Sequence, residues 1–228
     1  MDLPVWQGLY SSVRDTNLMP LTVAFDARGA EAARPWIEAA KPEYPCLIDS
    51  GHVVGGLYGM VNVPTAVWID EDGMIVRPPE SAGTNDAFRQ MDRENFSIPP
   101  EAAASLAAQR GGYVEALRDW ARNGAASEFA LSPEEVRRRL VPIEPAAARA
   151  AACALMGDHL ARAGRVEDAQ RYFAEATELQ PENWSYRRQA WNLEHPLKSG
   201  GPEFWAAVDA LGDDHYYRPT DIPPKVAK

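Results

Sequence analysis

Thiol chemistry is the first chemistry to consider, because this chain has two cysteines, Cys46 and Cys153. Dithiol/disulfide exchange needs an attacking thiolate with a second thiol beside it. A Cys-x-x-Cys motif at a helix start supplies both, since the helix amides stabilise the thiolate. The 228 residues contain no such motif. We expect Cys46 in a buried strand after Pro45 and Cys153 in an alanine-rich helix. Both are therefore predicted to be unreactive core thiols rather than a disulfide pair, as in a reducing compartment.

Histidines and acidic residues are the next candidates for chemistry. Asp213-Asp214-His215 offers metal ligands, but no second cluster adds a third or fourth ligand at a suitable spacing. His52, His159 and His195 are each isolated from any nucleophile in the sequence, and an isolated histidine is usually a surface or packing residue. The glycine-rich run 51–59 lacks the Lys and Ser/Thr of a phosphate loop. We predict no catalytic residue, no metal, no cofactor, and a solvated acidic turn at 213–215.

Val63-Pro64-Thr65 says most about the fold, because it leads into the apolar run 66–69 and the turn 70–73. A proline at the mouth of a buried strand has no N–H to donate to the ladder. It must therefore stand at the first strand position or in a special turn, often with a cis peptide bond. This arrangement is typical of thioredoxin-type folds.

A longer pattern surrounds this proline, with four features in order: the strand-like segment 44–49, the turn 53–59, the proline at 63–65 and the hairpin 69–76. The pattern resembles the redoxin branch of the thioredoxin-like superfamily, the TlpA/ResA-like and peroxiredoxin-like proteins, over roughly the first 95 residues. The resemblance implies an α/β thioredoxin-like fold that is incomplete, since the family's first strand and its Cys-x-x-Cys would lie upstream of Met1.

The resemblance also implies a binding site. In the family, the residue before this proline offers main-chain hydrogen bonds to an extended substrate beside the active thiols. Val63, Pro64 and Thr65 are therefore the substrate-binding residues that the resemblance implies. Such binding outlives the loss of the thiols, because strand-like pairing uses main-chain groups.

Two explanations fit a redoxin-like chain without its thiols. In the first, the chain belongs to a longer thiol-disulfide oxidoreductase, which exchanges dithiols and disulfides through a mixed disulfide. A start codon placed too far downstream, a trimmed end or a selenocysteine codon read as a stop would each produce this chain. In the second, the chain is a non-enzymatic adaptor for a protein or peptide partner. The missing strand is central in the family's sheet, so a homodimer or a rearranged monomer would have to cover the exposed edges.

Hydrophobic periodicity gives alternating elements in the first half. We expect helices at 4–14 and 30–40 and a helical turn at 52–58. Strands are expected at 20–26, 45–49 and 65–69, and 74–77 is the hairpin partner of 65–69 across Asp72-Gly73. This order is an α/β layer pattern. The segment 81–100 reads as a connector, with a helix around 86–93.

The second half is helical, with segments at 101–109 and 113–122 and a capped helix start at Ser132-Pro133-Glu134-Glu135. Within 151–194 the small and aromatic residues stand at tetratricopeptide-repeat (TPR) spacing. They are Met156, Gly157, Leu160, Gly164, Ala169, Phe173, Ala176 and Pro181. One repeat cannot bury its apolar face alone, so it stabilises the first domain or forms part of a peptide groove. The prolines beyond residue 218 predict a tail that wraps back across a domain surface.

Sequence order thus predicts four parts: a thioredoxin-like domain at 1–98, a helical connector at 99–144, an all-α TPR-like hairpin at 145–200 and a tail at 201–228. The formal net charge of −10 argues against a nucleic-acid or membrane partner, since both need a basic face. The chain has no apolar stretch of membrane-spanning length and no signal-peptide pattern at its start, so we expect a cytoplasmic protein.

Overall fold

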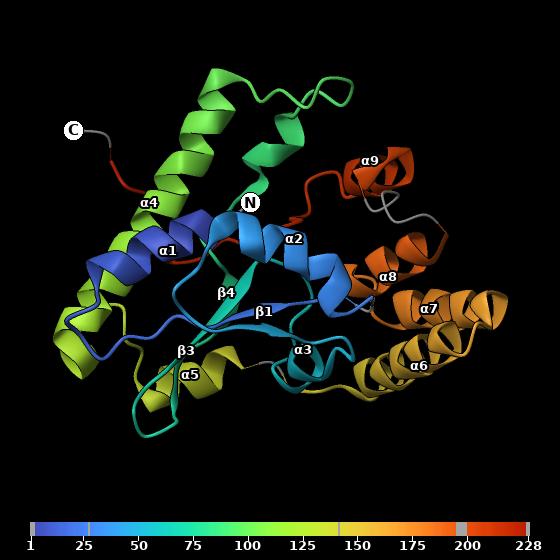
Figure 1. The fold of residues 1–228 in the computed structure, drawn as a ribbon, viewed down its shortest axis with the longest axis horizontal. Coiled ribbons are helices and arrows are strands. Elements are labelled where there is room, and N and C mark those ends of the chain that lie inside the picture. Colours follow the sequence, from blue (N-terminus) through green and yellow to red (C-terminus); the bar gives the residue numbers. More distant parts are fainter. Residues whose placement is uncertain (1–2, 27, 141, 195–199, 227–228) are drawn as a thin grey trace. The chain divides into compact units, whose positions relative to one another are not determined.

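The computed structural model has a mixed α/β fold and describes residues 3–26, 28–140, 142–194 and 200–226 (Figure 1). Its contacts group the chain into two compact units. Unit 1 combines residues 1–20, 63–140 and 211–228, and unit 2 combines residues 21–62 and 141–210. Each unit is therefore built from segments distant in sequence, whereas the four predicted parts follow one another along the chain.

Unit 2 contains a small parallel sheet made of β1 (Thr22–Ala24) and β2 (Cys46–Ile48), with Thr22 opposite Cys46. Helix α2 (Ala30–Ala40) connects the two strands, and α3 (Val53–Leu57) follows them. These elements confirm the predicted helix at 30–40, both predicted strands and the helical turn. The prediction of a buried strand at Cys46 is wrong, because its side chain is half-buried and its neighbour Leu47 is 49% exposed.

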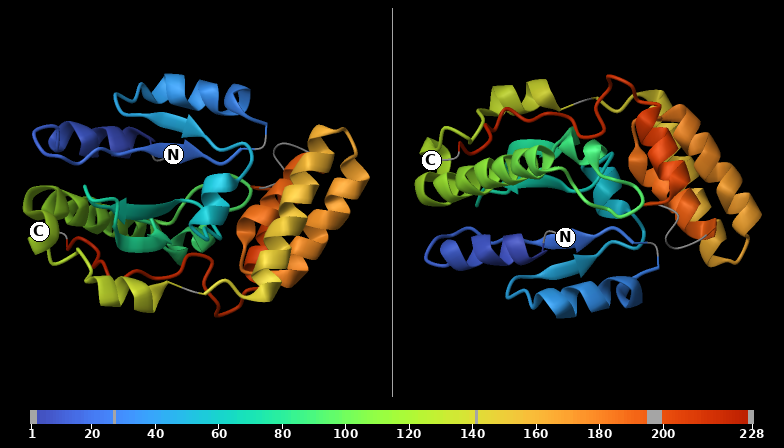
Figure 2. Two further views of the ribbon diagram at one scale, coloured as in Figure 1. Left: turned by 90° about the horizontal axis from the view of Figure 1, so that it is seen from below. Right: turned by 90° about the horizontal axis from the view of Figure 1, so that it is seen from above.

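The rest of unit 2 is helical. Helices α6 (Pro145–Arg162) and α7 (Val166–Leu179) lie side by side (Figure 2). Helices α8 (Trp184–Glu194) and α9 (Pro202–Asp209) follow. Small residues let α6 and α7 approach: a Cβ on Gly157 would lie 2.9 Å from the Phe173 ring. The buried core of this part consists of Ala150, Cys153, Ala154, Phe173 and Ala176.

Unit 1 contains α1 (Leu3–Ser12) and an antiparallel hairpin of β3 (Thr65–Ile69) and β4 (Ile75–Ser81). The helices that follow are α4 (Pro100–Asn123) and α5 (Pro133–Arg139). The Ser132 side chain caps α5 by accepting from the N–H of Glu135, as predicted. Short 3₁₀ turns occur at η1 (Asp86–Gln90) and η2 (Gly124–Ala126).

Two expectations for unit 1 need correction. The helical segments at 101–109 and 113–122 are one continuous helix, α4, because Gly111-Gly112 is compatible with helical geometry and serves close packing instead of a break. The helix expected around 86–93 is only the 3₁₀ turn η1, because Asn85 caps its start and the chain is extended again at Met91.

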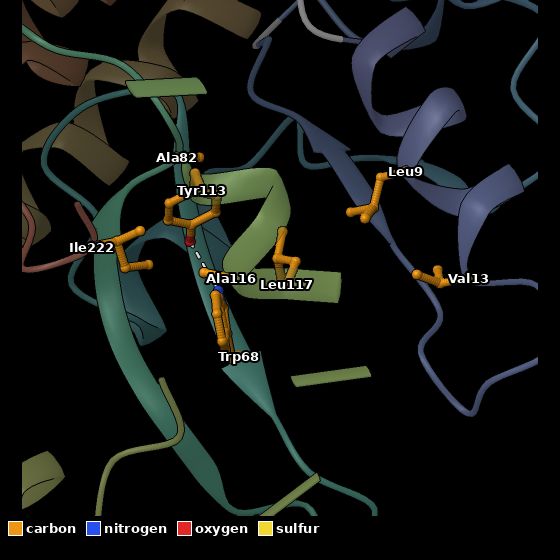
Figure 3. Packing of buried hydrophobic residues seen from close by; sticks show 8 residues of the cluster. All are labelled: Leu9, Val13, Trp68, Ala82, Tyr113, Ala116, Leu117 and Ile222. Carbon is orange, nitrogen blue, oxygen red and sulfur yellow. Dashed lines mark hydrogen bonds between the residues drawn. The ribbon is translucent and has the colours of Figure 1, made fainter. Parts of the chain in front are cut away.

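The core of unit 1 joins residues from α1, β3, α4 and the C-terminal residues 211–226 (Figure 3). The Trp68 indole N–H donates to the Tyr113 hydroxyl at 2.9 Å, and Trp68 also stacks on Trp120 at 5.1 Å. The buried members are Leu9, Val13, Trp68, Ala82, Tyr113, Ala116, Leu117 and Ile222. Of the predicted tail at 201–228, residues 211–226 return to unit 1, where Ile222 enters the core, whereas 202–209 form helix α9 of unit 2.

The strands of the described residues form two separate two-stranded sheets, β1-β2 and β3-β4. A two-stranded sheet offers few ladder hydrogen bonds, so its stability depends on the helices packed against it. Helix α4 does this for β3, since the ring of its Tyr113 lies edge-on to Trp68 at 5.9 Å. Among the residues that the structure describes, no helix is both long enough and apolar enough to cross a bilayer.

Candidate functional site

The three residues named by the resemblance lie together at the start of β3. The peptide bond between Val63 and Pro64 is cis. Thr65 begins the strand and pairs with Ser81, while the Pro64 carbonyl accepts the N–H of Ala82 at 3.1 Å. The proline thus precedes the ladder, where its missing N–H costs no hydrogen bond.

The carbonyl of Val63 is already paired, and its partner is distant in sequence. The Tyr217 hydroxyl donates to it at 3.2 Å. Tyr217 is itself held by Asp86, whose Oδ1 accepts the Tyr217 N–H at 2.7 Å and whose Oδ2 accepts the Tyr216 N–H at 3.0 Å. The Phe88 ring contacts both tyrosine rings, with centroids at 4.9 and 5.3 Å. The tail segment around Tyr217 therefore already contacts the loop that the resemblance implies as a binding site.

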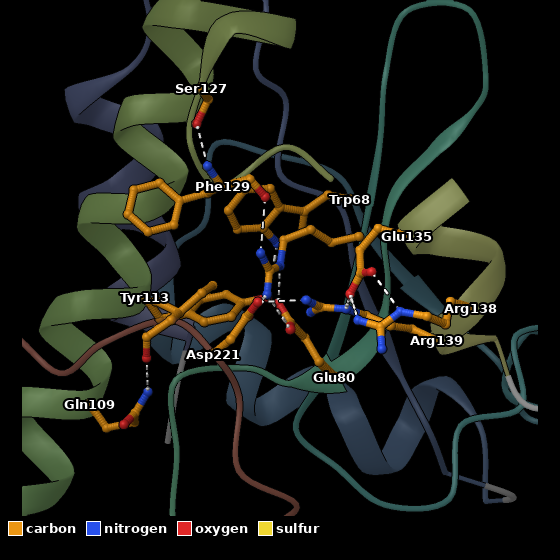
Figure 4. A network of polar contacts seen from close by, with 12 residues as sticks. Trp68, Glu80, Gln109, Tyr113, Ser127, Phe129, Glu135, Arg138, Arg139 and Asp221 are labelled. Atoms are coloured by element: carbon orange, nitrogen blue, oxygen red, sulfur yellow. Dashed lines mark hydrogen bonds and ion pairs between the residues drawn. The ribbon is translucent and has the colours of Figure 1, made fainter. Parts of the chain in front are cut away.

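A buried arginine anchors the same tail further along. Arg77 of β4 is 1% exposed, and its guanidinium binds Glu80 through two bonds of 2.7 and 2.9 Å. Figure 4 labels Glu80 and the neighbouring Phe129, Asp221 and Arg139 of this network. Arg77 also donates to the Phe129 carbonyl at 2.9 Å, pairs with Asp221 and lies over the Trp68 ring at 5.4 Å. Every face of this cation thus has a partner, as a buried charge requires.

Asp221 is shared by two arginines, since Arg139 of α5 donates to its other oxygen at 2.8 Å. Burial alone would raise the pKa of Asp221, but the hydrogen bonds from Arg139 and Arg77 outweigh it and lower the pKa to about 2. The carboxylate is therefore ionised throughout the physiological range and holds the tail to β4 and α5.

A second polar cluster lies in unit 2, where sequence reasoning found only isolated residues. His52 Nδ1 lies 2.9 Å from Asp158 Oδ2, and His52 Nε2 lies 3.2 Å from Gln189 Nε2. Asp158 and Gln189 are buried, and Arg162 donates to the Ser50 carbonyl at 3.0 Å. The cluster ties the loop before α3 to α6 and α8. No signal in the sequence pairs His52 with Asp158, because 106 residues separate them.

The two thiols lie in environments that do not favour attack. Cys46 accepts a hydrogen bond from the Thr22 hydroxyl at 3.1 Å, and Cys153 is buried between α6 and α7. Burial raises the pKa of the Cys153 thiol. Both cysteines are free. Neither begins a helix, so neither receives the stabilisation that an attacking thiolate needs.

For the other histidines and for the turn at 213–215, the sequence predicts no site. His215 Nδ1 lies 3.3 Å from Asp86, next to the two captured tyrosines, and His195 lies outside the described residues. Within the described ranges, no group of three or more His, Cys, Asp or Glu side chains is arranged to hold a metal ion.

Comparison with known proteins adds no assignment to this geometry. No family model, no curated protein and no solved structure matches the chain.

Proposed function

We propose that this chain is a non-enzymatic protein-binding module with a thioredoxin-like part and a helical part containing one TPR-like repeat. It binds an extended segment of a partner at Val63, Pro64 and Thr65. The observation that carries the proposal is the hydrogen bond between the Tyr217 hydroxyl and the Val63 carbonyl. It supports a main-chain acceptor at this loop that takes a donor, here a side-chain hydroxyl, from a segment 154 residues away. In strand-like recognition the same carbonyl would accept a main-chain N–H of the partner.

The helical part contributes less directly to binding. On α6, Asp158 and Arg162 already contact His52 and the Ser50 carbonyl. A partner peptide on this face would have to replace those contacts, and a buried aspartate left without its partners is costly. The loop at Val63 is therefore the better candidate for the partner, and the helical hairpin supports the fold of unit 2. We place the protein in the cytoplasm, where free thiols such as these persist.

The alternative is dithiol/disulfide exchange by a longer form of the protein. The observation favouring it is that the elements of 44–76 occur in the order that the redoxin resemblance implies. A disulfide-reduction assay tests whether this chain itself exchanges dithiols and disulfides. We expect no turnover above that of the reductant alone, because neither Cys46 nor Cys153 begins a helix and burial raises the pKa of the Cys153 thiol. Turnover that disappears in a Cys46→Ser variant would make the chain an enzyme and refute the adaptor.

Photo-crosslinking tests the proposed binding loop directly. Random short peptides are selected on the immobilised full chain and then mixed with two variants that carry p-benzoylphenylalanine. One variant has it in place of Val63, and the matched control has it in place of Val53, which is 57% exposed and lies in unit 2. We expect crosslinks at position 63 and none at 53. An absence of crosslinks at 63, or equal crosslinking at both positions, would refute the proposal.

A further inference from the structure

The C-terminal segment, residues 211–226, belongs to the chain itself but contacts unit 1 as a bound peptide would. It runs past β4 and ends at α4 (Figure 2). Arg89 donates to the carbonyls of Gly212 and Asp214 at 3.0 and 3.1 Å, and the Ser81 hydroxyl donates to the Arg218 carbonyl at 3.1 Å. These bonds use main-chain groups of the segment, as recognition of an extended peptide does.

The far end of the segment is packed rather than merely tethered. Gln109 donates to the Ile222 carbonyl at 3.1 Å, and the Lys225 N–H donates to the Ala108 carbonyl at 2.8 Å. Gly112 of α4 leaves room for this approach, because a Cβ there would lie 2.0 Å from the Pro223 carbonyl oxygen. The segment is thus fixed at both ends of the stretch 215–218, the part that covers the loop at Val63.

The middle of the segment, at Tyr216 and Tyr217, contacts a surface whose groups fit some side chains better than others. We define the tyrosine-binding surface as Val63, Asp86 and Phe88. Asp86 accepts two consecutive main-chain N–H groups, which requires an extended or turned chain without proline at either position. Phe88 contacts both rings, and the Val63 carbonyl accepts the second hydroxyl. Phenylalanine would fill the same space but leave that carbonyl without its donor.

We propose that the tyrosine-binding surface recognises partner segments containing an aromatic residue followed by tyrosine, and that Tyr216-Tyr217 of the chain itself competes for it. This inference rests on the proposed function and names its ligand class. A segment anchored on both sides has an effective concentration on the order of millimolar at its site. An outside segment therefore binds only to the fraction of molecules in which 215–218 has left the surface, and its apparent affinity falls by that fraction.

Tyr217→Phe separates competition from recognition. The substitution weakens the hold of the chain's own segment and leaves every atom of the surface in place. We expect a labelled peptide of residues 213–219 to bind the Tyr217→Phe chain roughly threefold to tenfold more tightly than the wild-type chain, the effect of one hydrogen bond. Tyr172→Phe on α7, in unit 2, is the matched control and should leave the peptide's dissociation constant unchanged.

Two further measurements test the surface itself. The same peptide with phenylalanine in place of the second tyrosine should bind the Tyr217→Phe chain no more tightly than it binds the wild-type chain. Asp86→Ala releases the chain's own segment but also removes the acceptor that the peptide needs. The peptide should therefore bind the Asp86→Ala chain less tightly than the Tyr217→Phe chain. Equal dissociation constants for the wild-type and Tyr217→Phe chains, together with equal binding of both peptides, would overturn the inference while crosslinks at position 63 still support the proposed function. If the photo-crosslinker at position 63 gives no crosslinks in either the wild-type or the Tyr217→Phe background, the proposed function itself is refuted.

Discussion

Replacing Arg77 with methionine is expected to lower the free energy of unfolding by about 3–5 kcal/mol, the usual cost of removing one partner of a buried ion pair. Methionine keeps an apolar contact with Trp68 but leaves Glu80, whose side chain is 13% exposed, without its cation. The loss also leaves Asp221 with Arg139 as its remaining arginine, so the C-terminal segment loses one of two anchors. Urea unfolding followed by tryptophan fluorescence measures the change.

Arg138→Met is the matched control for Arg77→Met. Arg138 also pairs with a glutamate three residues away, Glu135, but its side chain is 75% exposed. Exposed pairs contribute at most about 1 kcal/mol, so this variant should unfold close to the wild-type urea midpoint. Equal effects of the two substitutions would contradict the role given to burial at Arg77.

Acid unfolding gives a second measurement on the Arg77→Met variant. The pKa of Asp221 in the folded chain is about 2, below the value of about 3.9 for an unfolded aspartate. Its contribution is therefore complete above about pH 4 and is lost as the pH falls toward 2. Without Arg77 the pKa of Asp221 should rise, so the variant should lose less stability than the wild type over this range.

Phe173→Ala should cost about 3–5 kcal/mol, because it empties the centre of the core between α6 and α7. Phe173 is 1% exposed, and its ring fills the space above Gly157, where no Cβ fits. Its neighbour Tyr172 is 36% exposed, so Tyr172→Ala is the control and should cost under about 1 kcal/mol.

Thiol labelling reports on the same cavity. Cys153 belongs to the cluster around Phe173 and is 8% exposed. In the Phe173→Ala chain, we expect a thiol reagent to modify Cys153 faster than in the wild type, because the cavity lets the helices separate more often. An unchanged labelling rate, with unfolding also unchanged, would show that Phe173 does not close this core.

The local elements of this chain follow from local signals. The strand at 65–69 and the helix at 30–40 have the predicted bounds, because alternation, helical periodicity and turn residues all act within a few residues. Cys46 departs from prediction for a related reason. An apolar run predicts a strand well, but the burial of that strand depends on which sheet it joins. Among the strands that the structure describes, β2 pairs with β1 alone.

Long-range pairing is what the sequence could not supply for the site. The resemblance indicates Val63, Pro64 and Thr65, but nothing in their sequence indicates that the Tyr217 hydroxyl pairs with the Val63 carbonyl. Arg77 reads as an ordinary polar residue of a hairpin, yet it is buried because Asp221, 144 residues later, returns to it. A single sequence contains no pattern that links such pairs, since each partner satisfies its local element equally well alone.

The interleaving of the two units bears on how the protein is made. Residues 1–20 are made long before residues 211–228, yet Leu9 and Val13 share a core with Ile222. Residues 21–62 likewise complete unit 2 only together with residues 141–210. Neither unit can complete its core before its last segment has been made, 211–228 for unit 1 and 141–210 for unit 2, unlike domains that fold one after another as they emerge. The apolar side chains of α1 therefore lack part of their core until residues 211–228 have been made.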